Sequence, residues 1–450
     1  MMVLRRLSRN WWMVLWCSQL ILLAPVVAYV LVRLYAGPSL GTVMVPVAIF
    51  SIAYAAFVVV LGVTGRGRNW IYMHRYQMAL SLITVVIAYV ACEATTSALY
   101  FAGVLGPPRV LYLYENLQET MHFDSIRGYR LERTPSRTAR ITNGIIEYIG
   151  QLQGNNMGFP DRDDFNAKRL NLKGRRFAVF GDSFTAAQYL SRNWPDLAED
   201  LTRDTERPLE LLNFSIDGGG LANWWSVLTR IVKAEGYEID GVVFVVFPPD
   251  LLRGFSVAEQ RGYDRYMYGR VPRWDPRYFP STREEAEQYL SEKPNGYIVT
   301  TSEFNAALKG EGMPKERRVP YLASIIYRAL QWAVDRSSFN PSRNEVVKSE
   351  RIALIGDIRQ SLQSMGVPVV VVFIPMREDL LAKGDQIEVD ADTREFASLI
   401  GAKLVNGGLA FKGLSTSEIR ADWLPYDGHW GQGGSDRFAR FMIEVLTNLQ

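Results

Sequence analysis

Three long apolar stretches in the first quarter of the chain restrict its fold more than any other feature of the sequence. They cover residues 11–32, 43–63 and 78–105. A helix of about 20 apolar residues is long enough to cross a hydrocarbon core of roughly 30 Å. Three consecutive helices that are hydrophobic on every side are not expected in a globular domain. We therefore expect three transmembrane helices within residues 1–108.

The arginines around these stretches predict their orientation. Only Arg33 lies between the first and second stretches. Six other arginines precede the first stretch or lie between the second and third: Arg5, Arg6, Arg9, Arg66, Arg68 and Arg75. By the positive-inside rule, the N-terminus and the second loop are cytoplasmic. Everything after residue 105 is then expected outside the cytoplasm, in the periplasm or at the cell surface if the source is a bacterium.

The remaining composition excludes several classes of protein. The first 110 residues hold eight arginines and a single acid, Glu93, so the basic excess of the chain belongs to this segment and predicts no nucleic-acid partner. Glu93 lies in the third apolar stretch, where a carboxylate is either a functional group or a hydrogen-bonded group near the headgroups. Both cysteines, Cys17 and Cys92, lie in apolar stretches, so neither a disulfide framework nor a cysteine metal site is expected.

From residue 175 onward, short apolar runs alternate with amphipathic stretches. We expect strands at 177–180, 209–214, 241–247, 367–374 and 403–405. We expect helices at 185–201, 345–365, 392–400 and 435–449, the second of them closed by Gly366 at its C-terminal cap. Alternation of this kind predicts an α/β fold, with a parallel sheet covered by helices on both faces.

Two segments lack this alternation of apolar runs and amphipathic stretches. Residues 109–174 are polar and have few long apolar runs, so we expect a connector there. Residues 255–340 look like an insertion with a helix at 320–334, and they are rich in charges, prolines and aromatic side chains, Trp274 among them. These rings either stack on sugar faces near the edge of the sheet or pack the insertion onto the body.

A Gly-Asp-Ser turn at 181–183 follows the apolar run at 177–180 and precedes a predicted helix. It places the Ser183 hydroxyl at the carboxyl edge of a parallel sheet, beside a helix N-terminus that can stabilise an oxyanion. A serine nucleophile needs a base, and the base needs an orienting group. Near the C-terminus, Asp427 and His429 supply both. The alternative interpretation of the turn alone is a simple helix cap.

These residues resemble the SGNH hydrolases, the GDSL-type esterase and lipase superfamily, over about residues 175–450. The turn around Ser183 is similar to the family's first block, and Asp427 and His429 are similar to its last. Residues 213–218 resemble the second block, whose glycine, here Gly218, lends an N–H to the oxyanion hole together with the Ser183 N–H. The resemblance implies a three-layer α/β/α sandwich, and it implies no metal or organic cofactor.

The chain departs from the family pattern in two ways. Pro249 stands where the third block has an asparagine that completes the oxyanion hole, and losing such a donor costs on the order of 100-fold to 1000-fold in turnover. Asn223 is a candidate replacement, and Asn223, Trp224 and Trp274 are candidate substrate-binding residues. The acid and base are separated by one residue, similar to SGNH-type proteins of bacterial cell-surface polysaccharide acetylation.

The sequence therefore predicts a membrane-anchored serine esterase of the bacterial inner membrane. Its external domain, residues 175–450, would act on acyl esters of carbohydrate, acetyl esters foremost, with Ser183, His429 and Asp427 as its catalytic residues. One alternative is an O-acyltransferase of envelope polysaccharide that works with a multi-span membrane acyltransferase. The other is a non-catalytic SGNH-like protein that binds or scaffolds glycan.

Overall fold

The computed structural model describes residues 110–449 except 171–172, 263, 292–294 and 312–340, together with a few isolated positions between 69 and 95. By its contacts the chain divides into two units, and the described residues from 110 to 311 and from 341 to 449 belong to the second. Among the described residues, no helix has both the length and the apolar character needed to cross a bilayer. The three predicted spans lie almost entirely outside the described residues, as do Glu93 and the predicted helix at 320–334.

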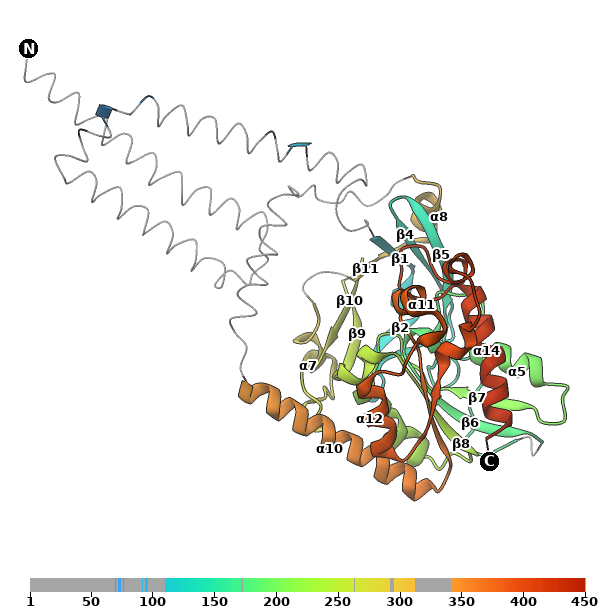
Figure 1. The fold of residues 1–450 in the computed structure, drawn as a ribbon. Helices are drawn as coiled ribbons and strands as arrows, with labels where there is room; N and C mark the ends of the chain where they lie inside the picture. The colour runs from blue at the N-terminus through green and yellow to red at the C-terminus, as the bar shows by residue number, and fades with distance from the viewer. Residues whose placement is uncertain are drawn as a thin grey trace, which may run out of the picture. The chain divides into compact units, whose positions relative to one another are not determined.

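A five-stranded parallel sheet forms the centre of the second unit (Figure 1). Its strands are β6 (Arg175–Phe180), β7 (Leu209–Asn213), β8 (Gly241–Val246), β12 (Val369–Phe373) and β13 (Lys403–Asn406), in the order β13-β12-β8-β6-β7. Every neighbouring pair is parallel. The prediction of a parallel sheet is confirmed, and all five strands match the apolar runs in the sequence.

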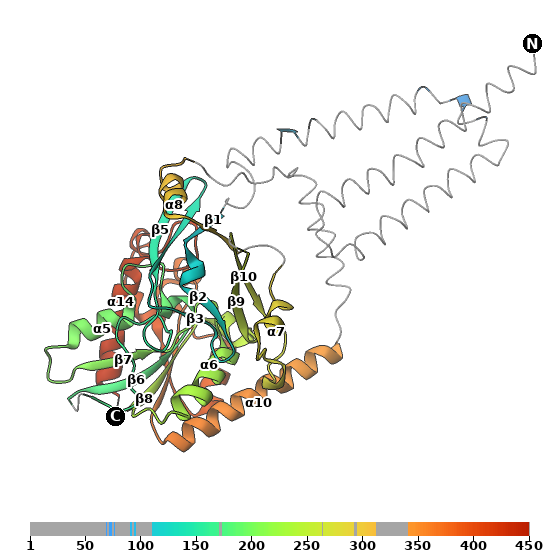
Figure 2. The same cartoon turned by 180° about the vertical axis from the view of Figure 1, so that it is seen from behind.

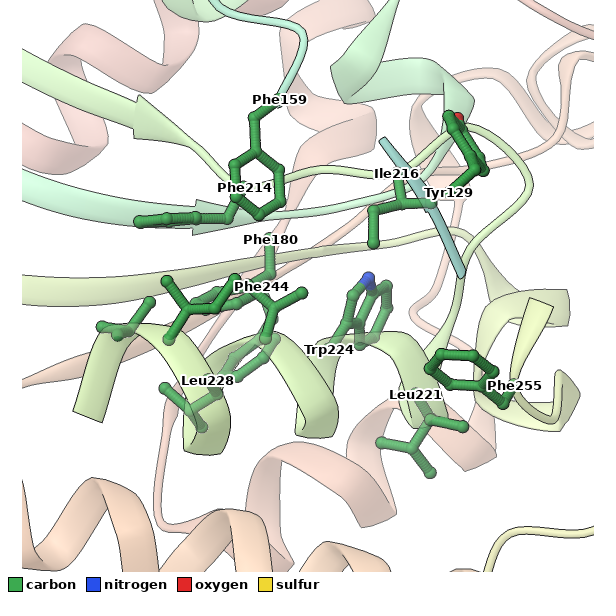
Figure 3. Close-up of a cluster of buried hydrophobic side chains, with 14 of the residues drawn as sticks. Tyr129, Phe159, Phe180, Phe214, Ile216, Leu221, Trp224, Leu228, Phe244 and Phe255 are labelled. Carbon is green, nitrogen blue, oxygen red and sulfur yellow. The ribbon is translucent and has the colours of Figure 1, made fainter. Parts of the chain in front are cut away.

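Helices cover both faces of this sheet (Figure 1). On one face lie α6 (Leu221–Val227), its continuation η2 (Leu228–Lys233), α10 (Pro341–Met365) and α12 (Ala391–Ile400), and on the other lie α5 (Trp194–Thr202), α11 (Arg377–Lys383) and α14 (Gln432–Thr447). Because side chains alternate along a strand, Phe180 and Phe244 enter the first core, and Phe177 and Val179 enter the second. Figure 3 shows Phe180, Phe244 and Trp224 in the first core, where the Phe244 ring packs against the other two. The three-layer α/β/α architecture is present.

A second, six-stranded sheet is built from the expected connector and the expected insertion together. It contains β1 (Val110–Glu115), β4 (Ser136–Thr142), β5 (Ile145–Leu152), β9 (Ser256–Arg261), β10 (Arg265–Arg270) and β11 (Gly296–Val299), in the order β5-β4-β1-β11-β10-β9. A hairpin of β2 (Met121–Asp124) and β3 (Gly128–Leu131) lies beside β9 (Figure 2). We call the six-stranded sheet the accessory sheet. The expected connector is therefore not a simple linker, because its residues 110–152 form the strands β1 to β5 and β1 pairs with the distant strand β11.

Several helix boundaries differ from the prediction. The helix expected at 185–201 is two helices, α4 (Ser183–Ala186) and α5, since Ala187 adopts a left-handed conformation with φ 42° and Asn193 caps a new helix start. α10 begins at Pro341, earlier than expected, and ends as predicted before Gly366, whose φ is +68°. The shorter helices are α7 (Arg283–Glu287), α8 (Thr301–Leu308) and α13 (Thr416–Ala421).

Candidate active site

Ser183 is the first residue of α4, directly after the carboxyl end of β6. Asp182 caps this helix by accepting the N–H of Phe184 at 2.9 Å, so its role is structural as well as electrostatic. Gly181 allows the turn to be tight, because a Cβ there would lie 2.4 Å from the Thr185 hydroxyl oxygen. The local sequence therefore fixes the Ser183 hydroxyl at the edge of the parallel sheet.

The three predicted catalytic residues form one hydrogen-bonded chain. The Ser183 Oγ lies 2.6 Å from His429 Nε2, and His429 Nδ1 lies 2.5 Å from Asp427 Oδ1. Asp427 Oδ1 also accepts the backbone N–H of His429 at 3.1 Å. Residues separated by more than 240 positions in the sequence thus meet with the geometry of a nucleophile, a base and an orienting acid.

The imidazole of His429 sits among aromatic rings but remains reachable. Its ring lies 4.7 Å from that of Phe184 and 5.2 Å from that of Tyr189, and 29% of its side-chain surface is exposed. Burial lowers the pKa of His429, the charges of Asp182 and Asp217 oppose this shift, and Arg140 adds to it. A lowered pKa keeps the imidazole neutral at physiological pH, as a general base requires.

The structure holds Gly218 in the left-handed conformation expected of a glycine in a tight loop, with φ +70°. Its carbonyl oxygen accepts the hydroxyl of Tyr268 at 2.6 Å and that of Ser256 at 2.8 Å, which fixes the loop. Its N–H faces the carboxylate of Asp217, a residue that reaches the surface although partial burial raises the pKa of its carboxyl group. Pro249 lies in the short helix η3 (Pro248–Leu252) and carries neither a side-chain donor nor an N–H.

Three candidate substrate-binding residues are buried, and the structure contradicts that assignment. Asn223 is fully buried and donates both amide hydrogens to the carbonyls of Arg127 and Ser256, so it cannot replace the missing oxyanion donor. Trp224 is fully buried and donates to the Gly181 carbonyl at 3.0 Å. Trp274 is 8% exposed and belongs to the core. Among the described aromatic residues of the insertion, Tyr266, Trp274 and Phe279 are buried in the core.

Two tyrosines of the accessory sheet, Tyr112 and Tyr148, lie near the predicted catalytic residues. The Tyr148 ring of β5 lies 5.5 Å from that of Tyr189, which contacts His429. Tyr112 of β1 accepts a hydrogen bond from Arg140 at 2.7 Å. Tyr112 and Tyr148 are half-buried. Burial raises the pKa of Tyr148, and the nearby charges of Tyr112 and Asp217 add to this shift.

Two charged residues that the sequence did not point to contact Asp427. Arg140 of β4 forms an ion pair with Asp427 Oδ2, and its Nε lies 2.8 Å from Glu147 of β5. Glu147 accepts the backbone N–H of Asp427 at 3.2 Å. No local motif marks them, because they come from strands that precede the α/β domain. Among the residues that the structure describes, no group of three or more His, Cys, Asp or Glu is placed to hold a metal ion.

Comparison with known proteins identifies no close relative. No family model matches the chain, and no curated protein does. Solved structures with a similar course of the chain include TesA (13% identity, 61% of this chain and 100% of that one, TM-score 0.32). A second is Axe2, an acetylxylan esterase from Geobacillus stearothermophilus, with 10% identity over 62% of this chain and 96% of that one and a TM-score of 0.31. A third is a lipase/acylhydrolase from Enterococcus faecalis, with 10% identity over 60% of this chain and 95% of that one and a TM-score of 0.28. TM-scores this low carry no information about activity, so the function has to be inferred from the site.

Proposed function

We propose that this protein is a membrane-anchored serine esterase of the SGNH type that removes acyl groups from carbohydrate outside the cytoplasm. The observation that carries the proposal is the hydrogen-bonded chain from Ser183 Oγ through His429 to Asp427, with contacts of 2.6 Å and 2.5 Å. The position of Ser183 at the carboxyl edge of a parallel sheet supports it, since such edges hold the active sites of open α/β folds.

In the proposed reaction, Ser183 Oγ attacks the acyl carbonyl carbon while His429 Nε2 takes the hydroxyl proton. The Ser183 N–H stabilises the oxyanion that forms, and so does the Gly218 N–H after it turns from the Asp217 carboxylate to the substrate. When the carbon–oxygen bond to the sugar breaks, His429 returns the proton to the leaving alkoxide, and an acyl-serine remains. Water, deprotonated by His429, then attacks the acyl-serine and releases the carboxylic acid and free Ser183.

The carbohydrate part of the proposal is supported by the side chains around the catalytic residues. Half-buried tyrosines at 112 and 148 offer partly open rings, and Asp217 offers an exposed carboxylate. Aromatic faces and carboxylates together suit the apolar faces and hydroxyl groups of sugars. The membrane anchor is proposed from the three apolar stretches and their flanking arginines, which predict an external active site.

A non-catalytic, glycan-binding role is favoured by one observation, the proline at 249. It removes a side-chain donor whose loss costs on the order of 100-fold to 1000-fold in turnover. A transferase would use the same acyl-serine, with a sugar hydroxyl in place of water, and would need a membrane partner to deliver the acyl group.

The test compares the full-length protein in nanodiscs with its Ser183→Ala variant and with Ser191→Ala, a control at an exposed serine on the same segment. Substrates are p-nitrophenyl acetate and acetylated oligosaccharides, with and without unacetylated acceptors. We expect the wild type and Ser191→Ala to release acetate and Ser183→Ala to lose this activity by 1000-fold or more, the order of loss when a nucleophile is removed. Acetate moving to a sugar faster than to water would favour the transferase. Equal rates for wild type and Ser183→Ala would favour the binding role.

A further inference from the structure

We infer that Arg140 and Glu147, from the hairpin of β4 and β5, are positioning residues for Asp427, so that the accessory sheet completes the catalytic site. The inference rests on the proposed function. Asp427 divides its two carboxylate oxygens between partners from different parts of the chain. Oδ1 accepts His429 Nδ1 at 2.5 Å, and Oδ2 forms the ion pair with Arg140 Nη1. The acid therefore cannot rotate without losing one of them.

Glu147 holds the backbone of the acid's loop. Its Oε1 accepts the N–H groups of Tyr426 at 2.8 Å and Asp427 at 3.2 Å, while its Oε2 lies 2.8 Å from Arg140 Nε. The Glu147 side chain is fully buried and Arg140 is 7% exposed. Charge-assisted hydrogen bonds in such surroundings are strong and directional. Arg140 thus orients the carboxylate, and Glu147 orients the main chain that carries it.

A β-bulge explains how a strand residue reaches this loop. In the pairing of β4 with β5, Arg140 is opposite Tyr148 and Ile141 is opposite Ile146, so Glu147 is the extra residue with no partner across the ladder. A bulge redirects the side chain of its extra residue and is frequently found beside active sites. Here it points the Glu147 carboxylate at residues 426–427 instead of along the sheet.

The charges of this cluster act on the protonation of His429 in addition to those of Asp182, Asp217 and Arg253, which the substitutions below leave unchanged. With His429 neutral, Arg140, Glu147 and Asp427 together carry one net negative charge, and protonation of His429 makes the cluster neutral. Removing the Arg140 charge leaves two negative charges, which favours the imidazolium. Removing the Glu147 charge leaves none, which favours neutral imidazole. The two substitutions therefore shift the protonation of His429 in opposite directions.

The experiment uses the full-length protein in nanodiscs and the variants Arg140→Met, Arg140→Lys, Glu147→Gln and Arg137→Met. Arg137 is the matched control, since it lies on β4 and forms an ion pair with Glu115. Two readouts are taken for each: the pH profile of kcat/KM with p-nitrophenyl acetate, and the titration of the His429 imidazole followed by NMR. The chain has three histidines, so His429→Gln identifies the signal.

We expect Arg140→Met to raise the pKa of His429 by about one pH unit and Glu147→Gln to lower it by a similar amount. Both should lower kcat by about tenfold or more because the acid is misplaced. Arg140→Lys should keep the wild-type titration but not the full kcat, since an ammonium cannot reproduce the fork of contacts. Arg137→Met should match the wild type.

Shifts of the same sign in Arg140→Met and Glu147→Gln, or a shift as large in Arg137→Met, would overturn the inference. If Arg140→Met does not fold, the other two variants still test the inference. Glu147→Gln should lower the pKa of His429, and Arg140→Lys should leave it at the wild-type value. A wild type without esterase turnover contradicts the proposed function alone, because the NMR titration reports on the cluster without any substrate.

Discussion

Arg253 forms an ion pair with Asp182, the residue that caps the helix carrying Ser183, with Nη1 and Oδ2 3.1 Å apart. The same guanidinium lies 2.6 Å from Asp250 Oδ1 and donates to the Gly219 carbonyl at 3.0 Å. One cation therefore joins the nucleophile turn, the loop of Gly218 and the segment after β8. Both carboxylates are buried, and burial raises the pKa of Asp250 strongly.

Replacement of Arg253 by methionine should destabilise the protein strongly. It would leave two buried carboxyl groups without their counter-charge, and breaking a buried pair in this way costs about 3–5 kcal/mol. The measurement is the free energy of unfolding from denaturant titration. Arg265→Met is the control, because Arg265 is 56% exposed in its side chain and its contact with Asp264 is 3.8 Å long, which predicts an effect below about 1 kcal/mol. Equal losses in the two variants would contradict the assignment.

Gly218→Ala should impair catalysis far more than an equivalent substitution elsewhere. A Cβ at Gly218 would lie 2.8 Å from the Tyr268 hydroxyl oxygen, so the loop would have to shift and carry the oxyanion N–H with it. We expect kcat for p-nitrophenyl acetate to fall by about 100-fold with a small change in KM. Gly236→Ala provides the control, since Gly236 has a similar φ of +65° but no atom within 4 Å of the added Cβ. A loss of kcat in Gly236→Ala as large as in Gly218→Ala would refute the role of this loop.

The activity should fall as the pH decreases through the lowered pKa of His429. The base acts in its neutral form, so kcat/KM should be full above this pKa and lost below it. Because burial lowers the pKa of the folded protein, the acid limb should lie below the ordinary histidine value of about 6.5. The same shift means that unfolding takes up a proton in this window, so stability should decrease as the pH falls from about 6.5. An acid limb above the ordinary value would contradict the burial of His429 described above.

Asp217→Asn should move the acid limb of the pH profile to still lower pH and change which substrate charge the site prefers. The negative charge of Asp217 raises the pKa of His429, so its removal should shift the acid limb to lower pH. It should also reduce the discrimination against mono-p-nitrophenyl succinate relative to p-nitrophenyl acetate, by about threefold to tenfold at low salt. Asp264→Asn, at a side chain that is 71% exposed, serves as the control. No change in either readout would exclude Asp217 from the site.

The α/β domain could be predicted closely because its signals are local. The strands β8 and β12 are continuous apolar runs, and β6 is apolar from Phe177 onward. All three are buried along almost their whole length, as central parallel strands must be. The accessory sheet could not be predicted in this way. Several of its strands mix polar and apolar residues, as β4 does, and β1 pairs with the distant strand β11, so that Leu113 lies opposite Tyr297. Pairing over such distances leaves no periodic trace in a single sequence.

The residues of the candidate site also differ in how well they could be predicted from the sequence. Ser183, Asp427 and His429 stand out in the sequence because nucleophile, acid and base follow known chemical requirements. Arg140 and Glu147 do not, because a strand arginine and a bulge glutamate have no fixed spacing from the residues they contact. Aromatic composition was misleading for Trp224 and Trp274, since a tryptophan in a core and one in a binding site give the same signal.

The account depends most directly on Ser183 being a nucleophile activated by His429. The decisive measurement treats the full-length protein with a fluorophosphonate and locates the adduct by mass spectrometry of its peptides. We predict one adduct, on Ser183, that forms more slowly as the pH falls through the pKa of His429 and is lost in His429→Gln. A folded protein that gains no adduct at Ser183, or that is labelled equally well without His429, would contradict the account.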